Sequence, residues 1–131
     1  MKTPNNLREK QPNPAARCNY FAGISAEDCV VRAYLSQGYQ LEAQRWRGKS
    51  GEIDLIFRHA PGVVFVEVKK SKSHERASAA LSQAQIKRIM TAAQEYMAEA
   101  TSDPLCDLRF DAALVDATGA LRIHENAFAW Y

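Results

Sequence analysis

The chain has 131 residues, of which 47% are hydrophobic and 24% are charged, and its formal net charge at pH 7 is +2. This length and composition fit one soluble domain with a single core, and the small net charge means that an anionic partner must be inferred from where the basic residues lie. No apolar run is long enough to span a bilayer, and the N-terminus lacks the apolar stretch of a secretory signal, so we expect a cytoplasmic protein without membrane contact.

The first predicted element is a helix that follows an unstructured start. Residues 1–17 carry three prolines and three asparagines without an apolar period, which predicts a flexible tail. Residues 18–131 are then expected to form the single folded domain. Ser25 is a suitable N-cap for a helix that carries Glu27 in its first turn and stops at Gly38.

Three strands are predicted next, over residues 39–47, 52–58 and 63–69, the last of which is a β-branched and aromatic run of strand length. The sequence RGKSG between the first two predicts a tight turn, with Gly48 and Gly51 adopting backbone angles that other residues resist. We therefore expect an antiparallel hairpin followed by a third strand.

A second helix and two short strands complete the pattern. Apolar residues keep a helical period from Leu81 to Ala100, and strands are predicted over residues 110–115 and 120–124, around the turn DATG. The order of helix, three strands, helix and two strands indicates an α/β domain whose mixed central sheet is flanked by helices.

The three cysteines, Cys18, Cys29 and Cys106, are odd in number, widely separated and without C-x-x-C spacing. This pattern indicates neither a disulfide framework nor a zinc site. We therefore expect reduced thiols.

Charged residues interrupt the two apolar strands that follow the hairpin turn. Side chains alternate across a strand, so Glu67 and Lys69 are expected on one face of the third strand. On the second strand, Ile53 and Leu55 are expected on the face opposite to Asp54. If the two strands pair, one register brings Asp54 beside Glu67 and Lys69.

This cluster of charges can be interpreted as a metal-binding catalytic site or as ordinary surface charges. Charges taken out of water persist only when they compensate one another or bind a cation, and Mg²⁺ or Mn²⁺ suits two carboxylates, a backbone carbonyl such as that of Val68, and several waters. Such an ion acidifies a bound water and neutralises phosphodiester charge, while Lys69 stabilises developing negative charge. On spacing alone, solvent-facing charges paired across the strands fit equally well, because E-x-K is a short motif.

The segments GEIDLI and VFVEVK, preceded by GYQLEAQRWR and by a helix with Glu27, resemble the YraN family of uncharacterised bacterial proteins. The resemblance runs from about Gly23 to Phe128. That family is similar to the PD-(D/E)xK nuclease superfamily, with its restriction-endonuclease-like core, and within it to archaeal Holliday-junction resolvases. The resemblance implies that Asp54, Glu67 and Lys69 are the catalytic motif residues. It also implies that Glu27 is a further catalytic acid and metal ligand.

Phosphate binding is the point at which the sequence departs from the family pattern. Ser71 stands where an arginine is common, two residues after the motif lysine, and Gln85 stands where the second helix commonly carries a lysine. Two basic stretches, QRWRGKSG and KKSKSHER, flank the strand pair and are expected to supply the contacts with nucleic-acid phosphates: Arg45, Arg47, Lys49, Lys70, Lys72 and Arg76.

The sequence therefore predicts a metal-dependent endonuclease that hydrolyses phosphodiester bonds in DNA, with branched or junction DNA as the substrate suggested by the resemblance. A two-fold homodimer would suit a four-way junction. Two alternatives stay open: a catalytically inactive nucleic-acid-binding module, and a structural or interaction protein that dimerises through a sheet edge. Convergence of the charged residues at one place in the structure would favour the enzyme.

Overall fold

The computed structural model describes residues 24–70, 82–100 and 107–127. The predicted tail over residues 1–17 lies outside this range, so its boundary with the domain over residues 18–131 stays a prediction. None of the helices in the described residues is long and apolar enough to cross a membrane.

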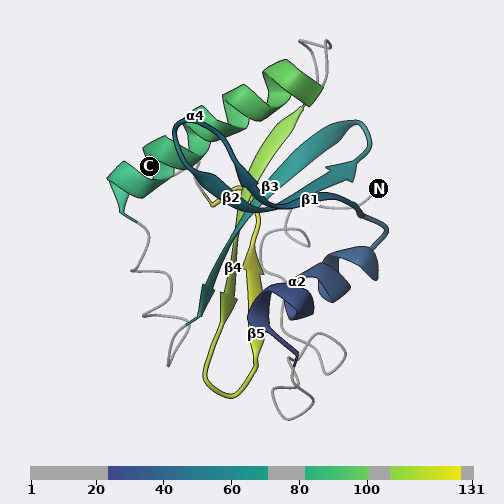
Figure 1. The fold of residues 1–131 in the computed structure, drawn as a ribbon. Helices are drawn as coiled ribbons and strands as arrows, with labels where there is room; N and C mark the ends of the chain where they lie inside the picture. The colour runs from purple at the N-terminus through teal and green to yellow at the C-terminus, as the bar shows by residue number, and fades with distance from the viewer. Residues whose placement is uncertain (1–23, 71–81, 101–106, 128–131) are drawn as a thin grey trace.

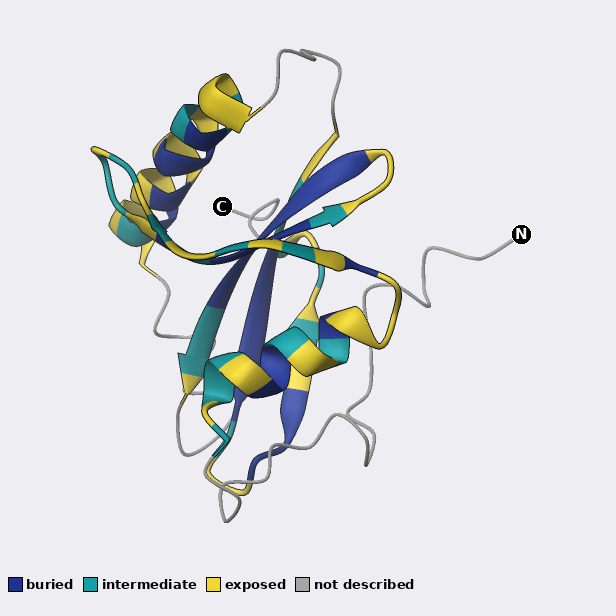
Figure 2. Cartoon of the chain, turned by 45° about the vertical axis from the view of Figure 1, so that its right-hand side comes forward, coloured by how far each residue is buried: buried dark blue, intermediate teal, exposed yellow. Residues whose placement is uncertain are grey.

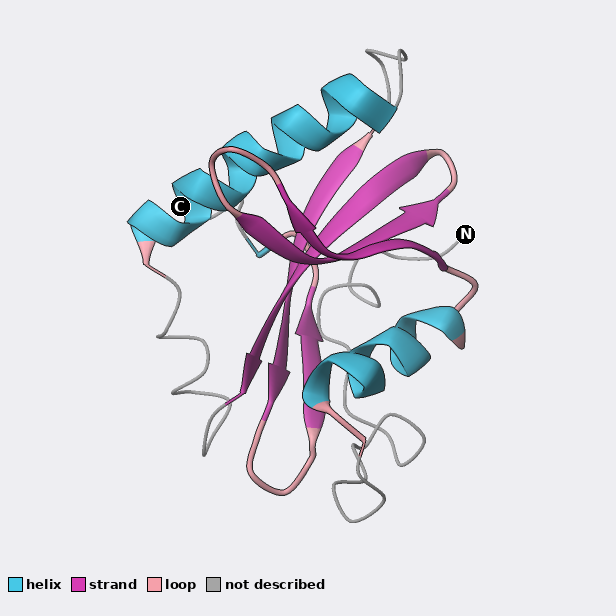
Figure 3. Cartoon of the chain, in the orientation of Figure 1, coloured by secondary structure: helices cyan, strands magenta, loops and turns pink. Residues whose placement is uncertain are grey.

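The elements follow in the predicted order. They are α2 (Ala26–Leu35), β1 (Gln40–Arg47), β2 (Glu52–His59), β3 (Gly62–Lys70), α4 (Gln83–Ala100), β4 (Leu108–Val115) and β5 (Leu121–His124). The strands form one sheet in the order β1-β2-β3-β4-β5, in which β3 and β4 are parallel and the other neighbours are antiparallel. Figures 1 and 3 show α4 on one side of this mixed sheet and α2 on the other, which confirms the predicted α/β architecture.

Helix α2 begins and ends where the sequence predicts. Asp28 N–H donates to Ser25 Oγ at 3.1 Å, an N-cap that satisfies one of the free amides of the first turn. Gly38 has a φ of 90°, and Tyr39 N–H then donates back to Tyr34 C=O at 3.2 Å. A left-handed glycine at this position ends the helix and turns the chain into β1.

The sheet separates two apolar clusters, one against each helix. The cluster against α4 includes Phe65 and Ile89, and the cluster against α2 includes Val30 and Val66. Strand β3 contributes to both clusters because its side chains alternate between the two faces. Burying an aliphatic or aromatic side chain of this size contributes about 1.5–3 kcal/mol. Figure 2 shows the resulting pattern, with buried residues at the centre of the sheet and on the sheet-facing sides of the helices.

The alternation of β2 breaks at Asp54, so one prediction is wrong. Ile53 packs in the cluster against α4 and Leu55 in the cluster against α2, although they were expected to share a face. In the register of β1 with β2, Arg45 stands opposite Asp54, and Arg45 has a φ of 51°. This left-handed conformation is rare outside glycine. The two strands are thus irregular at the same position, and beyond it Trp46 and Ile53 both face α4.

The turn between β1 and β2 forms as predicted, but for a different reason. Gly48 N–H donates to Gly51 C=O at 2.9 Å, and neither glycine has a positive φ. A Cβ atom on Gly48 would collide with Glu95 Oε1 and lie 2.8 Å from the Trp46 ring. The Glu95 carboxylate and the Trp46 ring, rather than backbone freedom, therefore favour glycine at position 48.

Cys29 on α2 forms a disulfide bond, so its predicted reduced state is wrong. The partner cysteine lies outside the described residues. Cysteine spacing in the sequence failed as a guide because pairing depends on the distance between the residues in the fold.

Candidate active site

Asp54, Glu67 and Lys69, which we call the acid site, come together on the α4 side of the sheet. In the register of β2 with β3, Leu55 pairs with Val66, and this places Asp54 opposite Glu67 at the next position. Lys69 Nζ lies 3.5 Å from Glu67 Oε2. The predicted register is therefore the one that forms.

The carboxylate of Asp54 is fixed by the backbone of β3. The pairing of β2 with β3 ends at Leu55, and beyond it Val68 N–H donates to Asp54 Oδ2 at 2.8 Å. Asp54 thus replaces a backbone acceptor at the point where the strands diverge.

Gln85, in the first turn of α4, connects the glutamate with the lysine. Its Nε2 donates to Glu67 Oε2 at 2.8 Å, and its Oε1 accepts from Lys69 Nζ at 3.3 Å. Ser82 Oγ accepts from Gln85 N–H at 3.1 Å and caps the helix, so α4 begins where this side chain reaches the sheet. In the sequence, Gln85 stood out as a departure from the family pattern of phosphate binding, and in the structure it has contacts inside the acid site.

One oxygen of Glu67 lacks a donor. The residue is 7% exposed, and its Oε1 atom is buried with no hydrogen-bond partner in the described part of the chain. Burial, followed by the negative charge of Asp54, raises the pKa of Glu67 to about 8. Burial also raises the pKa of Asp54, with a further contribution from the charge of Glu27. A shared proton or a divalent cation can satisfy such an oxygen.

Glu27 lies close enough to influence Asp54, but its carboxylate is held elsewhere. Its Oε1 atom is 3.2 Å from Arg45 Nε. Across residues 24–70, 82–100 and 107–127, no three His, Cys, Asp or Glu side chains are grouped so that they could hold a metal ion. The candidate ligands that the structure brings together are therefore Asp54 and Glu67, and the ligand role of Glu27 stays a prediction.

The predicted phosphate-binding residues are only partly described. Lys72 and Arg76 lie outside the described residues, as does Ser71. Lys49 is exposed in the hairpin turn, and Lys70 is exposed at the end of β3.

The two predicted arginines of β1 already form ion pairs. Arg45 pairs with Glu27 at 3.2 Å, and Arg47 Nη2 lies 3.5 Å from Glu52 Oε2. Both arginine side chains are mostly exposed, at 69% and 77%, so each pair contributes little to stability.

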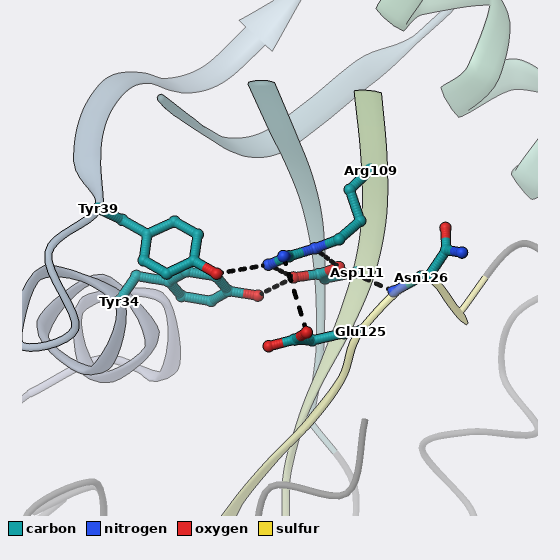
Figure 4. Close-up of polar contacts among 6 residues, drawn as sticks. All are labelled: Tyr34, Tyr39, Arg109, Asp111, Glu125 and Asn126. Atoms are coloured by element: carbon teal, nitrogen blue, oxygen red, sulfur yellow. Dashed lines mark hydrogen bonds and ion pairs between the residues drawn. The ribbon is translucent and has the colours of Figure 1, made fainter. Parts of the chain in front are cut away.

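A second buried acid, which was not among the residues predicted from the sequence, lies on the α2 side of the sheet (Figure 4). Asp111 is 0% exposed, and Arg109 donates to both of its oxygens at 2.9 Å. Tyr34 O–H donates to Oδ2 at 2.7 Å, and Asn126 N–H donates to Oδ1 at 3.0 Å. Arg109 also donates to Tyr39 Oη at 2.7 Å. An acid inside the apolar run RFDAALV is the same signal that marked Asp54.

Comparisons with known proteins identify a family. A model of the uncharacterised protein family UPF0102 matches residues 26–115. A UPF0102 protein of Roseobacter denitrificans is 55% identical over 115 residues, which cover 88% of this chain and 89% of that protein. A UPF0102 protein of Cereibacter sphaeroides is 53% identical over 111 residues, covering 85% of this chain and 95% of the relative. One of Ruegeria pomeroyi is 52% identical over 110 residues, covering 84% and 89%.

Proposed function

The chain belongs to the uncharacterised protein family UPF0102, and from the geometry of its acid site we propose that it is a metal-dependent DNA endonuclease. Family membership confirms the resemblance to the YraN family, and the fold is consistent with the PD-(D/E)xK superfamily. The observation that carries the proposal is the buried Oε1 atom of Glu67, which has no hydrogen-bond partner among the described residues and lies beside a second carboxylate. A divalent cation would complete this arrangement.

The donor set of the acid site suits a hard cation. Asp54 and Glu67 would hold Mg²⁺ or Mn²⁺ through carboxylate oxygens, with water completing the coordination. When bound, such a cation supplies an acidified water and neutralises charge on the phosphodiester. Gln85 and Lys69 occupy Oε2 of Glu67, which leaves Oε1 as the oxygen available to a ligand.

Lys69 is the residue that would act on the reacting phosphate. Its ammonium group contacts Gln85 Oε1 at 3.3 Å and Glu67 Oε2 at 3.5 Å, and its side chain is 21% exposed. An ammonium has three N–H donors, so one is left for a substrate oxygen. We expect it to stabilise the negative charge that develops during hydrolysis or to orient the attacking water.

The test is a nuclease assay on linear, flapped and four-way DNA with Mg²⁺ or Mn²⁺, combined with thermal melting of the same samples. Asp54→Asn and Glu67→Gln should abolish both cleavage and the metal-induced rise in Tm, because each removes a ligand charge. Lys69→Ala should abolish cleavage and keep the metal-induced rise. Glu52→Gln is the matched control, since Glu52 is a β2 carboxylate on an exposed position, and it should change neither result.

The unmutated protein provides the decisive outcome. Absence of cleavage on every substrate, together with a Tm that does not respond to metal, would refute the enzyme. DNA binding without these two properties would favour an inactive nucleic-acid-binding module. A protein that self-associates and binds no DNA would favour the interaction protein.

Branched DNA and a homodimer form the finer part of the proposal. Cutting two equivalent strands of a four-way junction needs two sites at a fixed separation, which a two-fold dimer provides. Edge strand β1 is poorly suited to extending the sheet across a dimer, because its register shifts between Leu41 and Ala43 and Arg45 has a positive φ. Sedimentation that showed a monomer with and without junction DNA would remove the dimer. A DNA substrate also fits the expected cytoplasmic location.

A further inference from the structure

Two basic residues on the hairpin turn and on α4 differ from the paired arginines of β1. Lys49 in the hairpin turn and Arg88 on α4 are exposed, and neither side chain has an ion pair or hydrogen bond in the described part of the chain. Arg45 and Arg47, in contrast, each hold a carboxylate within 3.5 Å. A polyanion can approach Lys49 and Arg88 without first displacing a protein carboxylate.

Helix α4 carries Arg88 between the acid site and the hairpin turn. Gln85 contacts the acid site and Glu95 contacts the turn, while Arg88 comes three residues after Gln85 and seven before Glu95. Residues at these spacings lie on the same side of a helix, and three residues advance about 4.5 Å along the axis. A Cβ atom placed on Gly51 would lie 3.6 Å from Arg88 Cβ, so the helix touches the turn at this level.

The backbone of the turn, rather than a basic side chain, compensates the charge of Glu95. Lys49 N–H and Ser50 N–H donate to Glu95 Oε1 at 2.9 and 3.4 Å, and Ser50 Oγ donates to Oε2 at 3.1 Å. Successive backbone N–H groups that converge on an anion form a nest. Glu95 therefore fixes the turn against α4 and leaves the ammonium group of Lys49 available.

We propose that Lys49 and Arg88 bind the phosphate backbone of a DNA strand that enters the acid site. The main phosphate contacts then come from the hairpin turn and α4 rather than from the arginines of β1. Lys69, Arg88 and Lys49 follow one another from the acid site toward the tip of the hairpin. This inference rests on the proposed function, because the acid site supplies the reason for DNA to lie along this path.

The test measures binding of labelled duplex and four-way DNA as a function of KCl, with Ca²⁺ in place of Mg²⁺ to suppress cleavage. Each phosphate contact contributes about 0.9 to the slope of log K against log salt. The double variant Lys49→Gln/Arg88→Gln should therefore reduce the magnitude of the slope by roughly 1.8 and weaken binding at low salt. Arg45→Gln/Arg47→Gln should reduce it less.

Arg122→Gln is the matched control, because Arg122 is exposed on β5, at the opposite edge of the sheet, and has no partner among the described residues. It should leave the slope unchanged, and all variants should melt as the unmutated protein does. An unchanged slope in Lys49→Gln/Arg88→Gln would overturn the inference, and the proposed function would stand if cleavage and the metal-induced rise in Tm persisted. An unmutated protein that bound no DNA would refute both.

Discussion

Two buried acids on opposite sides of the sheet differ in how their oxygens are satisfied. Each oxygen of Asp111 accepts two hydrogen bonds. Glu67 has Gln85 and Lys69 at Oε2 and no partner at Oε1 in the described part of the chain. A buried charge whose hydrogen bonds are all made is held in place by its partners, and its removal leaves those partners unpaired and destabilises the protein. A buried charge that lacks part of its hydrogen bonds lowers the free energy of unfolding. Such a charge is typical of a residue retained for binding or catalysis.

The largest expected effect comes from breaking the satisfied network. Asp111→Ala removes the carboxylate that holds Arg109 at 2.9 Å and leaves its guanidinium with only the longer ion pair to Glu125, at 3.7 Å; loss of one member of a buried ion pair costs about 3–5 kcal/mol. We expect a loss of this size in the free energy of unfolding, measured by urea denaturation. Asp54→Asn is the comparison and should be neutral or stabilising without metal. A loss for Asp111→Ala no larger than that for Asp54→Asn would contradict the distinction.

The pH dependence of stability should come from the other acid. The pKa of Glu67 is about 8 in the fold and 4.5 ordinarily, so between these values the folded protein holds a proton that the unfolded chain has released. The free energy of unfolding of the metal-free protein should therefore fall as pH rises through this window, by up to about 1.4 kcal/mol per pH unit.

Glu67→Gln provides the control for this pH dependence. The amide carries no titrating proton, so the variant should show a flatter profile and exceed the unmutated protein in stability at the upper end of the window. Urea denaturation in EDTA at a series of pH values measures both. Equal slopes for the two proteins would assign the pH dependence to another group.

The smallest expected effect tests whether the Asp111 network acts as a unit. Tyr34→Phe removes one of four hydrogen bonds to the carboxylate, and a neutral donor of this kind contributes about 1 kcal/mol. Burial raises the pKa of Tyr34 well above its ordinary value, so the hydroxyl remains a donor throughout the accessible pH range. In the Asp111→Ala background the same substitution should cost less, which a double-mutant cycle measures. Identical costs in both backgrounds would show that Tyr34 acts independently.

The acid site was predictable because its determinants are local. Glu67 and Lys69 are two residues apart on one strand, and a single register of a short hairpin brings Asp54 to them. The face of the sheet on which Ile53 lies was not predictable. It depends on the left-handed conformation of Arg45, which the fold stabilises and which no glycine in the sequence indicates.

The hydrogen bonds around Asp111 were only partly predictable from the sequence. Arg109 and Asp111 are two residues apart on β4, and this spacing alone would have predicted their shared face. Tyr34 and Asn126 come from α2 and from the segment after β5, and no local pattern places them beside the carboxylate. The contacts of Gln85 were not predictable either, because they depend on where α4 begins relative to β3.

Polar contacts hold helix α4 near both ends. Gln85 contacts the acid site, and about 15 Å further along the axis Glu95 contacts the hairpin turn, beside Tyr96, whose O–H donates to Glu42 Oε1. A contact at one end would fix the position of the helix but not its orientation, whereas contacts at both ends also fix the direction of its axis. The distance between the end of β3 and the tip of the hairpin therefore has to equal the length of helix between Gln85 and Glu95. One residue inserted between Gln85 and Glu95 would rotate Glu95 by about 100° about the helix axis, so that an intact helix could keep only one of the two contacts.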